Sequence, residues 1–203
     1  MIIKVCGIKD AQNLLDIGKL RIEMVGYNFY ALSPRFVDQS LPQISEKIKK
    51  VGVFVNATID EIKKIIQIYN LDYAQLHGDE SLEYIECVKS FIPTIKVFRI
   101  NDDFKPKILK YYDFCDYFLF DTASKNYGGS GQKFNWKILN NWEINRPFLL
   151  SGGIGPDDFG LFTTPVIDHS NYVGIDINSK FEVYPGFKDI KLLKDFVDRI
   201  KPI

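Results

Sequence analysis

A cysteine and an aspartate, Cys6 and Asp121, are the residues of this chain best suited by type to move protons in opposite directions. Each follows a short, mostly apolar run, residues 2–5 before the cysteine and residues 117–120 before the aspartate. A thiolate can act as a general base. A carboxyl group at the end of an apolar strand is partly desolvated, which raises its pKa and suits it to proton donation. The two residue types therefore indicate an isomerase-type acid–base pair.

Both residues also have purely structural interpretations. Most free cysteines are small buried hydrophobic residues, and Cys6 fits that description as well. Asp121 could instead cap a helix or anchor a loop. Which interpretation holds depends on whether the surrounding elements bring the two side chains to one place.

The chain alternates between strand-like and helix-like patterns from end to end. Candidate strands cover residues 2–6, 23–29, 52–55, 73–76, 95–99, 117–120, 148–150 and 172–175. Helices are predicted over residues 10–19, 41–50, 59–69, 81–91, 134–141, 156–162 and 189–201, with a weaker one over 104–112. Such a series of strand–helix units predicts a (β/α)₈ TIM barrel, formed by residues 1–203 as a compact single domain. A doubly wound open sheet is the structural alternative.

In such a barrel the chemistry lies at the carboxyl ends of the strands, and the polar residues of this chain gather there. Arg35 follows the second strand and could pair a substrate carboxylate through its planar fork, or be a surface arginine in a turn. His77, after the fourth strand, either forms a wall of the active site or is a histidine whose hydrogen bonds are already satisfied. Asp176, at the end of the eighth strand, is a further candidate for substrate binding. We interpret Arg99 as structural, and Cys87 and Cys115 as residues that pack in the core.

A phosphate site is predicted between the seventh and eighth strand ends. Gly152 and Gly153 follow the seventh strand, where glycines let the backbone approach an anion. The helix expected from Pro156 would point its amino end at that anion. Asn178 and Ser179 follow the eighth strand and could complete the cradle. The segment 127–132, which follows Asp121, is a candidate lid or an ordinary exposed loop.

The composition narrows the class of protein further. Of the 203 residues, 26 are Lys or Arg and 26 are Asp or Glu, so no basic surplus indicates a nucleic-acid partner. Cys6, Cys87 and Cys115 cannot form a closed disulfide set and do not have metal-ligand spacing, which favours a reducing compartment. No signal peptide and no apolar run of about 20 residues is visible. We expect a cytoplasmic protein without metal, cofactor or membrane partner.

Several motifs follow one another in an order that matches a known family. They are KVCGIK at 4–9, SPR at 33–35, VGVFVN at 51–56, QLHGDE at 75–80, FLFDT at 118–122, GGSGQKFNW at 128–136, SGGIGPDD at 151–158 and GIDINSKFEVYPGFKD at 174–189. With them the chain resembles the phosphoribosylanthranilate isomerase family over nearly its whole length. That family consists of (β/α)₈ barrels of tryptophan biosynthesis.

The resemblance implies an Amadori rearrangement of N-(5-phosphoribosyl)anthranilate, a small phosphosugar. It makes Cys6 the general base that takes the proton from carbon 2 of the sugar, and Asp121 the general acid that protonates the ring oxygen. It places Arg35 near the anthranilate carboxylate, and Gly153 with the 178–179 turn around the phosphate. It implies no cofactor, and a monomer or homodimer.

The chain departs from the family pattern at the phosphate site. Asn178, Ser179 and Lys180 stand where the family usually has two small hydroxyl residues and a glycine, while Ser130 and Asn135 replace a threonine and an aspartate. Two other functions compete with the isomerase. A different phosphosugar barrel, such as an epimerase or a neighbouring synthase, would usually carry a lysine or paired carboxylates at its strand ends. A non-catalytic barrel should have lost Cys6 or Asp121.

Overall fold

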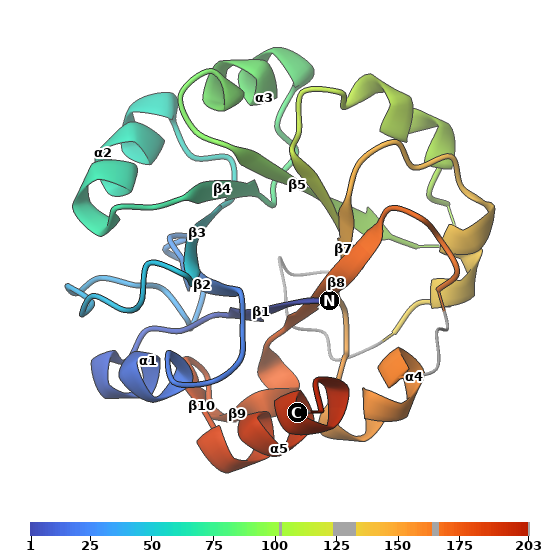
Figure 1. Cartoon of the computed structure of the whole chain (residues 1–203). Helices are drawn as coiled ribbons and strands as arrows, with labels where there is room; N and C mark the ends of the chain where they lie inside the picture. The colour runs from blue at the N-terminus through green and yellow to red at the C-terminus, as the bar shows by residue number, and fades with distance from the viewer. Residues whose placement is uncertain (102, 124–132, 164–166, 203) are drawn as a thin grey trace.

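The structure, a computed structural model, describes residues 1–101, 103–123, 133–163 and 167–202. Its strands close into a parallel barrel in sequence order (Figure 1). They are β1 (Ile2–Cys6), β2 (Met24–Asn28), β3 (Lys49–Phe54), β4 (Tyr73–Leu76), β5 (Thr94–Ile100), β6 (Tyr117–Thr122), β7 (Phe148–Leu150) and β8 (Tyr172–Ile177). The barrel closes where β8 pairs with β1, with Lys4 opposite Asp176. The predicted (β/α)₈ barrel is therefore confirmed, and the open sheet is excluded.

Helices surround the strands (Figure 1). In the described residues the α-helices are α1 (Ala11–Ile17), α2 (Ile59–Tyr69), α3 (Leu82–Lys89), α4 (Phe159–Thr163) and α5 (Ile190–Ile200). The start of α2 shows how the sequence sets these bounds. Thr58 accepts a hydrogen bond from the backbone N–H of Glu61, and the Glu61 carboxylate accepts one from the backbone N–H of Thr58, which is a complete capping box. Asn70 ends the helix in the left-handed conformation.

The prediction of a helix over residues 41–50 is wrong. No regular helix connects β2 to β3, and Lys49, inside the predicted helix, begins β3 opposite Met24. Leu41, Ile44 and Ile48 have helical spacing and do pack against the core, but from an irregular chain. Strand pairing with β2 begins at Lys49 and thereby includes the last two residues of the predicted helix.

Three other connections are shorter or tighter than predicted. The weak helix over 104–112 is a 3₁₀ helix, Pro106–Tyr111, and the helix over 134–141 is a 3₁₀ helix, Trp136–Asn141. The helix over 156–162 is a 3₁₀ turn, Pro156–Asp158, followed by α4. Short 3₁₀ pieces are how a barrel of only 203 residues connects its later strands.

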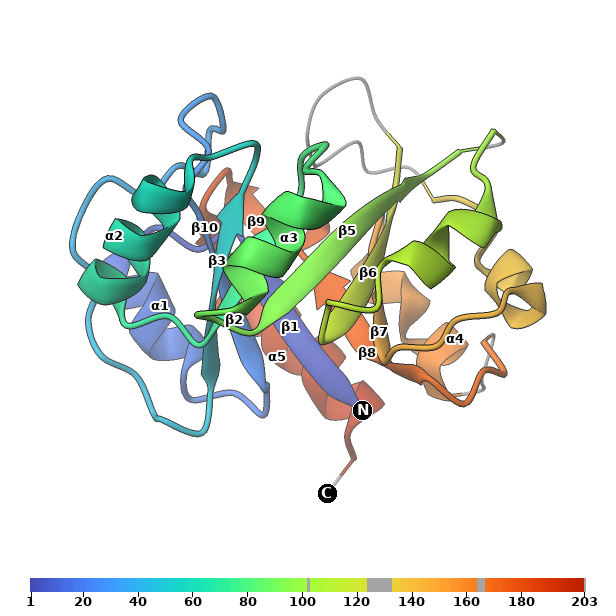
Figure 2. The ribbon, with the colours of Figure 1, turned by 90° about the horizontal axis from the view of Figure 1, so that it is seen from above.

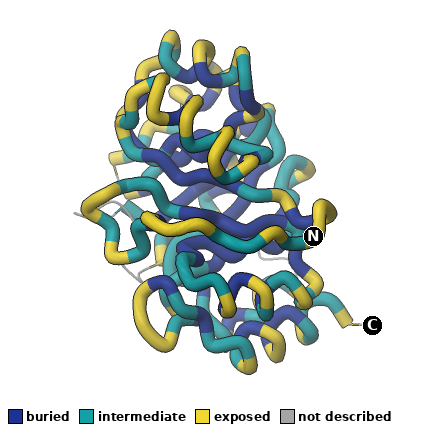
Figure 3. The backbone as a smooth tube through the Cα atoms, turned by 90° about the vertical axis from the view of Figure 1, so that its left-hand side faces the viewer, coloured by how far each residue is buried: buried dark blue, intermediate teal, exposed yellow. Residues whose placement is uncertain are grey.

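The apolar side chains form two layers. Inside the barrel, strand residues alone make a small core, formed by Met24, Val51, Ile95, Val97, Leu119 and Leu149. A larger core lies between the strands and the helices, and alternate strand residues such as Ile3 and Val5 point into it. The strands are accordingly the most buried part of the chain, and exposed residues lie on the outer elements (Figure 3). Lys4 and Cys6, which alternate with Ile3 and Val5, therefore face the barrel interior.

A small hairpin follows β8 and lies close to the candidate site. It consists of β9 (Glu182–Tyr184) and β10 (Phe187–Lys188), joined to β8 through a 3₁₀ turn, Ser179–Phe181. In the view of Figure 2 the hairpin lies in the upper half of the molecule, while both ends of the chain lie at the bottom. The hairpin thus brings Glu182 and Lys188 to the end of the barrel that also holds the 178–179 turn.

Candidate active site

Cys6 is the last residue of β1 and is only 6% exposed. Its register partner is Gly26 on β2, where a Cβ atom would lie 2.7 Å from Sγ of Cys6 and 3.1 Å from Nζ of Lys4. The glycine therefore leaves the space that the thiol and the ammonium group occupy. Burial raises the pKa of Cys6, Lys4 lowers it and Asp176 raises it further, with a net increase. Cys6 is therefore a thiol at neutral pH and has to lose its proton before it can act as a base.

Lys4 was missed by the sequence analysis as a site residue. It is fully buried, and its Nζ donates to Oδ1 of Asp176 at 2.9 Å. Burial alone would lower the pKa of Lys4, but Asp176 and Cys6 outweigh it and raise the pKa. The signal for Lys4 was present, because a lysine two residues before Cys6 in an apolar strand has to share the cysteine's face. Asp176, predicted to bind substrate, holds this lysine through one of its carboxylate oxygens, Oδ1.

Asp121 lies on β6 and is 9% exposed. Its Oδ1 accepts a hydrogen bond of 2.8 Å from the backbone N–H of Thr122. Burial, followed by the negative charge of Asp176, raises the pKa of Asp121 to about 7, although the Thr122 bond and Lys4 act in the opposite direction. A carboxyl group with this pKa is partly protonated near neutral pH and can donate a proton. The raised pKa is the one expected for a carboxyl group ending an apolar strand.

His77 lies beside Asp121, with Nε2 3.6 Å from Oδ2 of the aspartate. Burial, helped by the charges of Lys96, Lys4 and Arg99, lowers the pKa of His77 to about 3. The imidazole is therefore neutral, and the pair is not an ion pair at neutral pH. The distance exceeds a direct hydrogen bond, so His77 forms a polar wall next to the carboxyl group.

A buried lysine fixes the loop that carries His77. Nζ of Lys96 donates to Oε2 of Glu80 at 2.7 Å and to the Gly78 carbonyl at 2.8 Å. The other Glu80 oxygen accepts the backbone N–H groups of Gly78 and Asn56 at 2.9 and 3.1 Å. The polar groups of this loop thus bond to one another, which holds the His77 backbone in place.

The guanidinium group of Arg35 is already paired with a carboxylate of the chain. Its Nε donates to both oxygens of Glu182 at 2.9 and 3.1 Å, and its Nη2 donates to Oε2 at 2.6 Å. Burial would lower the pKa of Arg35, but Glu182 raises it. A Cβ atom on Gly7, whose φ is +75°, would lie 2.6 Å from Cδ of Arg35 and 2.7 Å from Oδ1 of Asn178. The arginine and the 178–179 turn therefore meet directly above the end of β1.

The predicted phosphate loop has the backbone shape that requires glycine. Gly152 and Gly153 have φ values of +90° and +67°. A Cβ atom on Gly152 would lie 2.3 Å from Oγ1 of Thr122, the neighbour of Asp121. The helix expected to point at this loop is, however, a 3₁₀ turn whose first N–H, on Gly155, already donates to Asp158 at 2.7 Å. Any anion there has to depend on the loop rather than on a helix dipole.

The turn of Asn178 and Ser179, the second part of the predicted phosphate site, is hydrogen-bonded to Lys188. The sequence analysis did not identify this lysine as a site residue. Lys188 is fully buried, and its Nζ donates to Oδ1 of Asn178 and to Oε1 of Glu182, each at 2.7 Å. Burial lowers the pKa of Lys188 to about 8, against the opposing charge of Glu182. Ser179 and the exposed Lys180 follow, and the Lys180 stem lies in van der Waals contact range of a Cβ atom on Gly155. Lys180 thus runs beside the 152–155 loop.

Other predicted residues lie apart from this group. Arg99 is ion-paired with Asp79 in an exposed position, which fits the structural role expected of it. Cys115 is buried at 3%, whereas Cys87 is exposed and so is not the packing residue predicted. The candidate lid, residues 127–132, lies outside the described residues.

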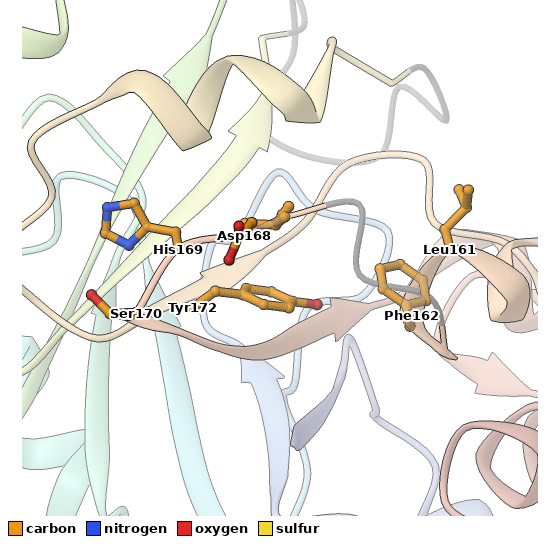
Figure 4. A pocket seen from close by; sticks show the side chains of 7 residues that line it. Leu161, Phe162, Asp168, His169, Ser170 and Tyr172 are labelled. Carbon is orange, nitrogen blue, oxygen red and sulfur yellow. The ribbon is translucent and has the colours of Figure 1, made fainter.

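A separate cavity of about 350 Å³ lies between α4 and the start of β8, with Asp168, His169 and Tyr172 among its lining residues (Figure 4). His169 is committed to the backbone, since its Nδ1 accepts from the Asn171 N–H at 3.1 Å. Because Tyr172 begins β8, this cavity is at the amino end of the strand, away from Asp176 and the candidate active site.

Two further classes of feature are absent from the described ranges. No helix there combines the length and apolar character needed to cross a lipid bilayer. The same residues do not gather three or more histidine, cysteine, aspartate or glutamate side chains in a way that could hold a metal ion.

Comparison with known proteins identifies the family. The family model described as N-(5'-phosphoribosyl)anthranilate (PRA) isomerase matches residues 3–199. The isomerase of Parabacteroides distasonis is 44% identical over 98% of this chain and 93% of that protein, and that of Petrotoga mobilis is 40% identical over 99% and 97%. The crystal structure of phosphoribosyl anthranilate isomerase from Thermotoga maritima superposes with a TM-score of 0.84 at 29% identity, covering 100% of both chains. Because the match extends over almost the whole sequence and the whole barrel, this chain belongs to the N-(5'-phosphoribosyl)anthranilate isomerase family.

Proposed function

We propose that Cys6 is the general base and Asp121 the general acid of the isomerisation that this family catalyses. The chain converts N-(5'-phosphoribosyl)anthranilate, an aminoaldose, to 1-(2-carboxyphenylamino)-1-deoxyribulose 5-phosphate, an aminoketose, in tryptophan biosynthesis. The observation that carries the assignment is the Asp121 carboxyl group, whose pKa of about 7 follows from burial on the same barrel rim where β1 presents Cys6.

The proton movements balance within the substrate and these two groups. Asp121 gives a proton to the ring oxygen as the furanose opens, which leaves a protonated imine at carbon 1. Cys6 then takes the proton from carbon 2, and the electron pair of that bond neutralises the imine. The resulting enol becomes the ketone when the Cys6 thiol returns a proton to carbon 1 and the enol hydroxyl group gives its proton to the Asp121 carboxylate, which restores both groups. One group has to begin protonated and the other has to begin as a base. Burial keeps Asp121 partly protonated near neutral pH, whereas the Cys6 thiol, whose pKa is also raised, has to lose its proton before it can accept one from carbon 2.

We propose two anchors for the substrate. The phosphate would bind between the loop of Gly152 and Gly153 and the turn of Asn178 and Ser179, with Lys180 adding charge beside it. The anthranilate carboxylate would meet Arg35 on the side of the guanidinium that Glu182 does not occupy. A related crystal structure, at a TM-score of 0.80 and 26% identity, is described as a complex with reduced 1-(o-carboxyphenylamino)-1-deoxyribulose 5-phosphate, so that barrel accepts a ligand of this chemistry.

The proposal extends to the form of the protein. Residues 1–203 would act as one catalytic unit, as a monomer or homodimer, with a small phosphosugar as its substrate. The free thiols of Cys6, Cys87 and Cys115 suit a reducing compartment such as the cytoplasm.

The test is turnover of N-(5'-phosphoribosyl)anthranilate by the purified chain, followed by chromatography of substrate and product. Cys6→Ser should lower kcat on the order of 10²-fold or more, because a hydroxyl group is a far weaker base than a thiolate. Cys115→Ser is the matched control, since it removes a buried thiol outside the site and should leave kcat unchanged. Activity of Cys6→Ser within about tenfold of the parent would remove Cys6 from the role of base.

A further inference from the structure

The barrel interior holds a buried charged group that the proton transfers above do not use. Lys4 is 0% exposed and lies on the same face of β1 as Cys6, two residues away. A lysine buried in a barrel is stable there only if something offsets the cost of removing its charge from water. Asp176 supplies one counter-charge, at 2.9 Å.

The ammonium group also lies against the thiol. The point at which Gly26 would carry a Cβ atom is 2.7 Å from Sγ of Cys6 and 3.1 Å from Nζ of Lys4, so both atoms border one small space. The strand register fixes this arrangement, because Cys6 is opposite Gly26 on one side of β1 and Lys4 is opposite Asp176 on the other. The backbone of neither residue can shift without disturbing the pairing of β1 with β2 and β8.

We propose that Lys4 is a positioning residue that stabilises the thiolate of Cys6, and that Asp176 acts as its counter-ion and limits that effect. The proposal deepens the proposed function, since it rests on Cys6 acting as a base. A nearby fixed positive charge favours the anionic form of a thiol, as it does in other reactive cysteines. The Lys4 ammonium group has two neighbours: it donates a hydrogen bond to Asp176 and borders the same small space as the Cys6 sulfur.

Other charged groups also reach Cys6 and have to be considered. Lys188 on β10 and Arg35 after β2 are positive, and both donate hydrogen bonds of 2.6 to 2.9 Å to Glu182, whose single negative charge offsets one of the two positive charges. Asp176 on β8 is the negative group that acts on the thiol. Lys4 is the cation that most strongly favours the thiolate, ahead of Lys188.

The experiment measures the thiol directly, not through turnover. In a Cys87→Ser/Cys115→Ser background only Cys6 can be alkylated, and the rate of its reaction with iodoacetamide is followed by intact mass against pH. Lys4→Met should move the midpoint upward, so that alkylation at pH 7.5 slows by about tenfold or more. The kcat value should fall in the same proportion with little change in KM. Lys4→Arg should restore part of the alkylation rate, because it keeps the charge.

A matched control separates charge at Cys6 from loss of a buried lysine in general. Lys96→Met removes another buried barrel lysine that is paired with a carboxylate, Glu80, and should leave the alkylation midpoint of Cys6 unchanged. Near-UV circular dichroism checks that each variant retains its packing. An unchanged midpoint in a folded Lys4→Met, or an equal shift in Lys96→Met, would overturn the proposal.

Asp176→Asn is a second test, in which the alkylation rate of Cys6 should change in the opposite direction. The substitution preserves the shape of the side chain. With the carboxylate gone, the thiolate becomes the counter-ion of Lys4, and alkylation at pH 7.5 should become several-fold faster. If Lys4→Met does not fold, slower or equal alkylation of Asp176→Asn still refutes the proposal. Failure of the proposed base role would show differently, as retained turnover in Cys6→Ser with the alkylation shifts intact.

Discussion

The guanidinium of Arg35 is clamped by Glu182, which binds Nε and Nη2 at 2.6 to 3.1 Å although the two residues are separated by 147 positions in the chain. The clamp fixes the plane of the arginine over the end of β1. Glu182 also accepts a hydrogen bond from Lys188, so one carboxylate is the partner of two buried or half-buried cations. The orientation of Arg35 is therefore decided by the hairpin after β8 and not by its own loop.

Glu182→Gln should weaken substrate binding and destabilise the protein. A neutral amide cannot balance both Arg35 and Lys188, and leaving buried charge uncompensated should lower the free energy of unfolding by about 3 kcal/mol. We expect a raised KM with a smaller change in kcat, measured by steady-state kinetics together with urea unfolding. Glu86→Gln, on the exposed side of α3, is the control. An unaltered KM in Glu182→Gln would show that the clamp does not orient Arg35 for the substrate.

The pH profile of kcat/KM should show a broad plateau. Catalysis needs Asp121 protonated, with a pKa of about 7, and Cys6 deprotonated, with a pKa raised above its usual value. Below pH 7 activity should rise about tenfold per pH unit as thiolate forms. Above pH 7 loss of the Asp121 proton cancels further thiolate formation, and activity should fall only beyond the pKa of Cys6. In Asp121→Asn, at much lower activity, the break near pH 7 should vanish; its persistence would assign that pKa elsewhere.

Asp121 should also lower the stability of the protein at alkaline pH. Its pKa is raised on folding, so its contribution to stability is fully present below the pKa of the unfolded state, near 4, and is lost as pH rises through the folded value of about 7. Asp121→Asn should therefore be more stable than the parent at pH 8, by on the order of 2–4 kcal/mol, while being nearly inactive. Urea unfolding at pH 5 and pH 8 measures this. A parent protein whose stability is unchanged between these values would contradict it.

His77 should remain neutral across the physiological range. Burial and the nearby lysines lower its pKa to about 3, so between pH 5 and 8 its two ring nitrogens should keep the widely separated nitrogen shifts of a neutral imidazole in a two-dimensional NMR experiment, with only a small change as the neighbouring Asp121 ionises near pH 7. The only other histidine is His169, so loss of a signal in His77→Asn assigns the peak. Convergence of the two nitrogen shifts near pH 6.5 would mean that the Asp121 carboxylate pairs with a charged imidazole.

The two glycines of the phosphate loop should respond differently to substitution. Gly153→Val places a β-branched residue at a φ of +67° and should mainly raise KM, because it distorts the loop that would hold the phosphate. Gly152→Ala brings a methyl group within 2.3 Å of Oγ1 of Thr122, whose N–H holds Asp121, so kcat should fall as well. Gly160→Ala, where nothing lies within 4 Å, is the control. Equal effects of the two loop variants on KM alone would refute the distinction.

The sequence by itself determined the barrel fold and the residues that lie at the carboxyl ends of its strands. Apolar runs of strand length alternating with helical patterns predicted all the barrel strands, because hydrophobic periodicity is a local property. Placing polar residues after those runs was enough to find Cys6, Asp121, Arg35, His77 and the 152–153 loop, since parallel strands bring their carboxyl ends to one face. The missing helix over residues 41–50 shows the limit of this reasoning, because strand pairing with β2 overrode a helical spacing that was present.

Only the tertiary structure decided which charges neutralise one another. Lys4 and Asp176 are 172 positions apart and became neighbours when β8 closed the barrel against β1. The same closure committed Asp176 to Lys4, and the following hairpin committed Arg35 to Glu182. Burial and the charges of neighbouring groups set the pKa values of Cys6 and Asp121, and both depend on distances across the barrel that no local pattern contains. The identities of the site residues can thus be predicted from the strand pattern, whereas their protonation states depend on contacts that form only in the closed barrel.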